Sequence, residues 1–152
     1  NNNNDSVDMD FKSTQKDESD PITATCMQIT NQGVLLCMGY QSGELYLYNI
    51  SEGKPVMLIH TRLSNVNSLL ILCSDAKQKN AIVGDGVLFV GYQDGYIEAF
   101  NCSTGYQMLS KKCHIGGENG GIKQLITFNQ DYYVFSIGND NSVCSFLVYS
   151  QL

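Results

Sequence analysis

The sequence predicts an all-β protein built from about three repeated units of four short antiparallel strands. From Pro21 onward, the 152-residue chain consists of short runs of β-branched and aromatic residues, and each run is closed by Gly, Asn, Asp or Ser. Such runs are typical of short strands that are joined by turns. In addition, a stretch of eleven residues returns 52 positions later in the chain.

The repeated stretch begins at Gly39, returns at Gly91, and has a third, weaker copy that begins at Gly138. Each copy contains two small turn residues that suit the positive φ of a tight hairpin turn. These pairs are Ser42-Gly43, Asp94-Gly95 and Asp140-Asn141. Four short strands that recur with a period of about 40–50 residues are typical of β-propeller blades.

The strands of each unit follow from the pattern around the tight turn. The strands before it, Val34–Tyr40 and Val87–Tyr92, are almost continuously apolar, which indicates that neighbouring blades cover both of their faces. The strand after it alternates, as in residues 45–48, and is therefore less enclosed. We expect outer strands at Val56–His60 and Tyr106–Ser110. The units then span about 22–61, 66–110 and 122–149 of a repeat region at 21–152.

Residues 1–20 form an acidic segment rich in Asn, Asp and Ser, with six acids and two lysines. Within it, the apolar and polar residues of Val7–Phe11 alternate, as they do in a half-buried edge strand. We expect this segment to pair with the outer edge of the third unit, Ser142–Tyr149, in the same chain or in a neighbouring one. The alternative is a flexible acidic tail.

The repeats resemble those of the WD-repeat β-propeller family. That family's Trp-Asp pair is represented here by Tyr48-Asn49, Phe100-Asn101 and Phe146-Leu147, and its Gly-His pair by His60 and His114 alone. The stretch from Asp94 to Gly105 also resembles a blade of the quinoprotein type, which is the alternative. That family closes its blades with a Trp, and this chain has none.

The resemblance implies a buried structural network in the third unit. WD-type blades combine a His before the first strand with an Asp in the tight turn and a hydroxyl residue four positions before that Asp. His114, Asp140 and Ser136 take these places. The second unit keeps Asp94 but has Val90 in place of the hydroxyl residue, so we expect its network to be incomplete.

No residue pattern points to catalysis, and we expect no enzyme, no cofactor and no metal site. His114, Ser136 and Asp140 are formally a Ser-His-Asp set, but no nucleophile elbow surrounds the serine, and the structural network accounts for all three. The six cysteines contain no C-x-x-C pair. Because most of them lie in apolar runs, we expect reduced thiols that are buried as small hydrophobic side chains.

The charge of the chain argues against non-specific binding of nucleic acid, because the formal net charge is −6 and no basic block is present. No apolar run approaches the roughly 18 residues that a membrane helix needs, and the first residues are polar and acidic. We therefore expect an intracellular protein, cytoplasmic or nuclear, that makes no contact with a membrane.

About three blades cannot close a ring, since propellers close with about four to eight blades. An open end of the array would expose an apolar blade face and an unpaired strand edge. The chain is therefore expected to be part of a longer propeller, or to share a ring with further copies of itself or with a partner subunit.

The expected function is a non-catalytic scaffold that binds another protein. Tyr and Arg often anchor protein interfaces, and both occur near the tight turns. The candidate partner contacts are Tyr40, Gln41, Tyr92, Gln93 and Arg62. One alternative is that the two tyrosines fill space between blades. Another is that the chain is an enzyme or a ligand-binding propeller that uses its central channel.

Overall fold

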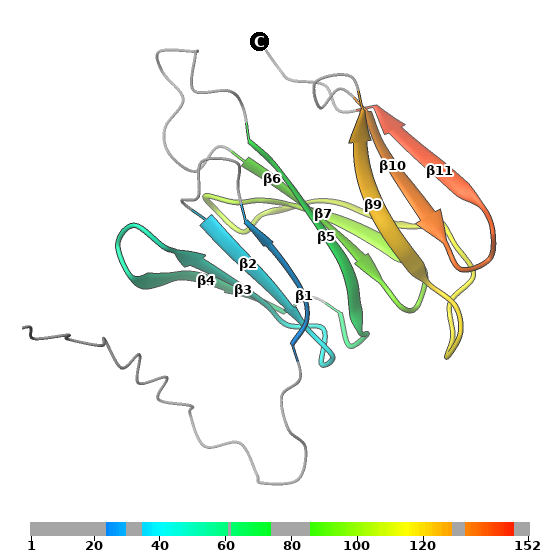
Figure 1. Cartoon of the computed structure of the whole chain (residues 1–152), viewed down its shortest axis with the longest axis horizontal. Coiled ribbons are helices and arrows are strands. Elements are labelled where there is room, and N and C mark those ends of the chain that lie inside the picture. Colours follow the sequence, from blue (N-terminus) through cyan, green and yellow to red (C-terminus); the bar gives the residue numbers. More distant parts are fainter. Residues whose placement is uncertain (1–23, 30–34, 61, 74–85, 129–132, 148–152) are drawn as a thin grey trace, which may run out of the picture.

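The structure, a computed structural model, describes residues 24–29, 35–60, 62–73, 86–128 and 133–147. In these ranges, eleven strands form three antiparallel sheets that lie side by side (Figure 1). The all-β prediction is confirmed. The segment at residues 1–20, with the edge strand predicted at Val7–Phe11, lies outside the described residues. The described ranges contain no helix that is long and apolar enough to cross a membrane.

Within each sheet, strands that are neighbours in the sequence are also neighbours in space. The first sheet contains β1 (Ala24–Ile29), β2 (Leu35–Tyr40), β3 (Leu45–Asn49) and β4 (Lys54–Ile59). The second contains β5 (Val66–Cys73), β6 (Gly86–Tyr92), β7 (Tyr96–Asn101) and β8 (Gln107–Lys112). The third contains β9 (Ile122–Phe128), β10 (Tyr133–Gly138) and β11 (Val143–Leu147). The first strand of each sheet contacts the first strand of the next, so β1, β5 and β9 form the inner row.

Two apolar layers fill the spaces between the three sheets, and strand β6 contributes to both of them. Leu88 and Val90 lie in the layer shared with the first sheet, whereas Phe89 lies in the layer shared with the third. The prediction that this strand is covered on both faces is therefore confirmed. Strand β2 differs, because its residues alternate between buried and half-buried. Among the described residues, a neighbouring sheet covers only one of its faces.

The three tight turns have the backbone conformation that the sequence predicts. The φ angles of Gly43, Gly95 and Asn141 are 90°, 87° and 61°. Each of these residues donates its amide to the carbonyl oxygen three residues earlier, at 3.0, 3.2 and 3.3 Å. Space at the glycines is equally restricted, since a Cβ on Gly43 would lie 1.9 Å from the carbonyl oxygen of Arg62, and one on Gly95 would lie 2.0 Å from that of His114. The tight turn of one blade therefore touches the connection that leads to the next blade.

Candidate partner-binding surface

The tight turns and the connections between blades together form one rim of the molecule. We call this surface the turn rim, and its described residues are 41–44, 60, 62–65, 93–95, 113–121 and 139–142. Backbone hydrogen bonds hold the connections against the turns: the amide of His114 donates to Gly95 at 3.1 Å, and the amide of Gly117 donates to Gln93 at 3.2 Å. Most of the candidate site residues lie on or directly beneath this rim.

In the third blade, the structure brings His114, Ser136 and Asp140 together. Nε2 of His114 lies 2.8 Å from the hydroxyl oxygen of Ser136, and Nδ1 lies 3.1 Å from Oδ1 of Asp140. Both His114 and Ser136 are buried. The contacts join the connection before β9 to the middle strand and the tight turn of the same blade. This geometry is the one that a structural network requires.

Asp140 is the charged member of this network, and several donors surround its carboxylate. The hydroxyl of Ser142 donates to Oδ1 at 2.6 Å, and the amide of Ile115 donates to Oδ2 at 2.8 Å. These hydrogen bonds, that of Ser142 above all, hold the pKa of Asp140 well below its usual range. Ser142 also lies 2.7 Å from Nδ1 of His114, although the sequence pattern did not include it in the network.

In the second blade, Arg62 occupies the place that His114 has in the third. The two residues are 52 positions apart in the sequence. The carbonyl oxygen of Arg62 faces Gly43 in the same way as that of His114 faces Gly95. The family resemblance had assigned this place to His60, whose side chain is exposed instead. The sequence analysis did not predict this role for Arg62, because His60 matches the residue type of the family's motif.

The guanidinium of Arg62 binds two carboxylates of its own chain. Its Nη1 lies 2.8 Å from Oδ2 of Asp94, and its Nη2 lies 3.2 Å from Oε1 of Glu98. The guanidinium carbon also lies 3.7 Å from the ring centroid of Tyr96, within the range of a cation–π contact. The side chain of Glu98 is only 2% exposed. The charge of Arg62 is therefore balanced inside the chain, in a cluster that replaces the incomplete network predicted for this blade.

The two candidate tyrosines differ in exposure although they occupy the same place in the repeat. Tyr92 is fully buried, and its hydroxyl donates to Oε2 of Glu98 at 3.2 Å. It fills the space between the first two blades and presents no surface to a partner. Tyr40 is half-buried, and its ring meets that of Tyr46 edge-on, with the centroids 5.2 Å apart. Burial raises the pKa of the Tyr40 hydroxyl.

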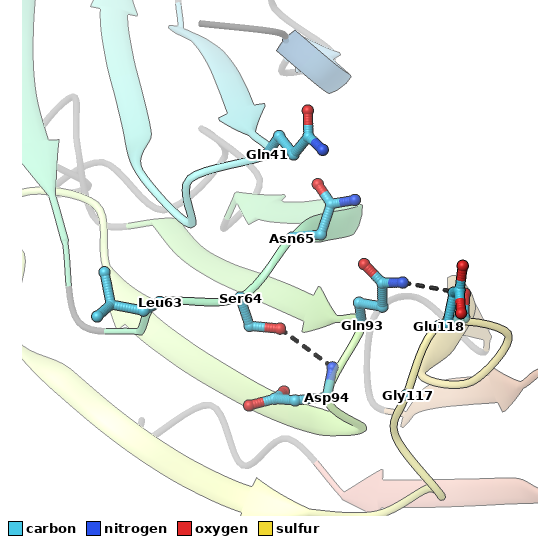
Figure 2. A pocket seen from close by; sticks show the side chains of 8 residues that line it. All are labelled: Gln41, Leu63, Ser64, Asn65, Gln93, Asp94, Gly117 and Glu118. Atoms are coloured by element: carbon cyan, nitrogen blue, oxygen red, sulfur yellow. Dashed lines mark hydrogen bonds between the residues drawn. The ribbon is translucent and has the colours of Figure 1, made fainter. Parts of the chain in front are cut away.

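Gln41 and Gln93 line an open hollow of about 400 Å³ on the turn rim (Figure 2). The other lining residues are Leu63, Ser64, Asn65, Asp94, Gly117 and Glu118. The side-chain amide of Gln93 donates to the carbonyl oxygen of Glu118 at 3.0 Å, which fixes one wall. Oδ1 of Asn65 is buried and accepts no hydrogen bond from the described part of the chain. The hollow thus combines several side-chain amide groups with hydroxyl and carboxylate oxygens.

Two aliphatic side chains on the turn rim were not among the sequence candidates. Leu63 is 88% exposed and Ile115 is 70% exposed. They are 52 residues apart, so they occupy the same place in successive connections. The sequence repeat could have identified both residues, because an aliphatic residue directly follows Arg62 and, 52 positions later, His114.

In the described ranges, no three His, Cys, Asp or Glu side chains lie close enough together to hold a metal ion. The rim instead offers amide groups, hydroxyl groups and exposed aliphatic carbon. Such groups recognise a polypeptide through hydrogen bonds and apolar contact.

The sequence matches no protein-family model and no curated protein. Solved structures do match it. The computationally designed Ika4 protein superposes with a TM-score of 0.61 and 17% identity, over 84% of this chain and 66% of that one. Sqt1 of Chaetomium thermophilum, solved bound to the N-terminus of the ribosomal protein L10, has a TM-score of 0.66 and 17% identity, over 80% and 31%. A chain of the mitotic checkpoint complex has a TM-score of 0.66 and 17% identity, over 88% and 36%.

The fold is a β-propeller. The three antiparallel sheets are successive blades, and the prediction of the fold class from the repeats is confirmed. At this level of identity, the likeness shows the fold alone. The chain spans about a third of the length of Sqt1 and of the checkpoint chain, and about two thirds of Ika4.

Proposed function

We propose that this chain is a non-catalytic scaffold of the WD-repeat type, located in the cytoplasm or nucleus, that binds another protein through its turn rim. The observation that carries this proposal is the pair of exposed aliphatic side chains, Leu63 and Ile115, at equivalent places on the rim. Exposed apolar side chains that are surrounded by polar groups are typical of interaction sites.

The WD-repeat type is supported by the geometry of the third blade. His114, Ser136 and Asp140 lie at the positions that the family resemblance implies, and they are within hydrogen-bond distance of one another through the histidine ring. The second blade departs from the family's pattern, because Val90 stands where a hydroxyl residue is expected and Arg62, in the place of the histidine, binds Asp94 and Glu98 instead. Both arrangements fasten a blade to the connection that precedes it.

The hollow supports a polypeptide as the ligand. An extended peptide presents its N–H and C=O groups alternately, and side-chain amides can both donate to and accept from such groups. Gln41, Asn65 and Gln93 follow one another across the hollow (Figure 2). Apolar side chains of the same ligand would pack on Leu63 and Ile115.

The comparisons support a scaffold role without specifying a partner. The structure of Sqt1 holds the N-terminus of a ribosomal protein, and the checkpoint neighbour is part of a protein complex. Both are propellers at 17% identity to this chain. Their fold is therefore compatible with the presentation of a surface to another protein, which is the activity proposed here.

The proposal is tested with the whole chain, immobilised as wild type, as a Leu63→Ser/Ile115→Ser double variant and as a control variant. Ile50→Ser is the matched control, because Ile50 is an aliphatic residue that is 42% exposed and lies outside the turn rim, in the turn between β3 and β4. Proteins retained from a cell extract are compared by quantitative mass spectrometry. Circular dichroism confirms that all three proteins are folded.

We expect at least one protein that the wild type and Ile50→Ser retain equally and that the double variant retains about tenfold less, as the loss of about 1.4 kcal/mol of apolar contact implies. Identical retention by all three proteins would contradict binding through the turn rim. A cofactor or metal found by native mass spectrometry of the purified chain would contradict the non-catalytic part of the proposal.

A further inference from the structure

The third blade turns a large apolar face away from the second blade. Strand register places Tyr133 opposite Phe128 on one side and Leu147 on the other, and Ile137 opposite Val143, so all of these side chains share one face of the sheet. Phe128 is 68% exposed, Val143 63% and Leu147 44%. We call this surface the trailing face; the polar residues Gln124 and Ser145 share it with the apolar residues Ile126, Phe128, Tyr133, Phe135, Ile137, Val143 and Leu147. In the described part of the chain, no sheet lies against it.

The trailing face resembles the face of the second blade that packs against the third blade. Phe135 lies five residues before the Asp of its tight turn and opposite Ile126, as Phe89 lies five residues before its own Asp and opposite Leu70. Phe89 and Leu70 are buried against the third blade, together with Ile97. The third blade thus repeats, on its outer side, the face by which the second blade packs against a following blade.

The first blade has the complementary half of such an interface. Its outer side, which we call the leading face, consists of Leu36, Met38, Tyr40, Tyr46, Tyr48 and Leu58. A shift of 52 residues places the first five of these on Leu88, Val90, Tyr92, Glu98 and Phe100, each of which is at most 1% exposed against the first blade. In the leading face, by contrast, all five are half-buried, and Leu58 is 54% exposed.

We propose that two copies of this chain associate head to tail, with the trailing face of each copy packed on the leading face of the other. The two contacts are equivalent and are related by a two-fold axis, so the assembly closes. The three blades described in each copy together make six, a number within the range of four to eight blades that propellers use. A second copy is the occupant because one chain carries both halves of a blade-to-blade interface. This proposal concerns other surfaces than the turn rim and is independent of the proposed function.

The test uses two variants that each destroy one face at exposed positions. Phe128→Lys/Val143→Lys places two charges in the trailing face, and Tyr48→Lys/Leu58→Lys places two in the leading face. Both carry the same sign, so the variants gain no attraction for each other. Met108→Lys is the control, because Met108 is 56% exposed on the outer strand β8 of the middle blade. The mass of each protein is measured by sedimentation, and circular dichroism checks its folding.

We expect the wild type and Met108→Lys to have twice the 16.8 kDa mass of one chain. Each double variant alone should be monomeric, because every contact in the ring needs one intact face of each kind. An equimolar mixture of the two double variants should recover dimers, since one of the two contacts can then form. A monomeric wild type, a dimer formed by either double variant alone, or a mixture that stays monomeric would each overturn the head-to-tail ring.

Discussion

Replacement of Arg62 by Met should destabilise the chain severely, because it leaves a buried carboxylate without its countercharge. Glu98 is 2% exposed, and its Oε1 accepts from both Nε and Nη2 of Arg62 at 3.2 Å. The hydroxyls of Tyr92 and Ser110 also donate to Glu98, and neither of these two groups carries a charge. Loss of one partner of a buried ion pair costs about 3–5 kcal/mol.

The low end of this range applies, since the side chain of Arg62 keeps 21% of its surface in solvent. We expect the free energy of unfolding to fall by about 3 kcal/mol. For a chain of this length, that change corresponds to a drop of roughly 6–12 °C in Tm. Urea titration followed by circular dichroism measures the first quantity, and thermal melting measures the second.

A second substitution separates the buried charge from a simple loss of packing. Glu98→Gln removes the charge but keeps the shape of the side chain, so adding it to Arg62→Met should recover about half of the lost stability. An Arg62→Met variant within about 0.5 kcal/mol of wild type, the range of an ordinary surface substitution, would refute the reasoning. So would a double variant that is less stable than Arg62→Met alone, because the uncompensated charge of Glu98 would then not be the cause.

Three further outcomes follow from the same contacts. Gly95→Ala should cost more stability in urea titration than Gly53→Ala. Both glycines have a left-handed φ, which costs about 1–2 kcal/mol for Ala, but only at Gly95 would the Cβ meet a carbonyl oxygen. Equal losses of stability would show that the backbone at His114 moves away without cost. The hydrogen bonds that lower the pKa of Asp140 stabilise the fold above the ordinary Asp pKa near 4, and their contribution is lost as the pH falls towards the lower pKa of the folded state. Wild type should therefore lose more stability than Asp140→Asn between pH 6 and pH 2. An equal loss of unfolding free energy in both proteins over this range would contradict the prediction. Burial, and to a lesser extent the neighbouring Cys144, raises the pKa of Cys113 to about 11. Alkylation of Cys113 by iodoacetamide at pH 8 should therefore be far slower in the folded chain than after unfolding. Equal rates would show that the thiolate of Cys113 forms readily in the folded chain.

Much of the candidate site could be placed from the sequence, and the parts that could not share one cause. The third-blade network of His114, Ser136 and Asp140 follows a spacing that the family resemblance supplies, and the structure brings these residues together. Ser142 and Arg62 were missed as network members, because their roles depend on contacts made in three dimensions. Arg62 reaches Asp94 and Glu98 across 32 and 36 residues, a separation over which no local pattern operates.

The strands and tight turns were determined by the sequence itself. Alternation of apolar residues and the conformational freedom of Gly43, Gly95 and Asn141 act within a few residues, so the repeat alone predicted the blades. Only the tertiary structure showed that β2, unlike β6, has a neighbouring sheet on just one of its faces in the described chain. Tyr40 and Tyr92 have the same place in the repeat, yet only Tyr92 is fully buried. The physical reason is that the burial of a side chain depends on whether a neighbouring blade packs against it. The first blade covers Tyr92, whereas no blade of the described chain packs against Tyr40.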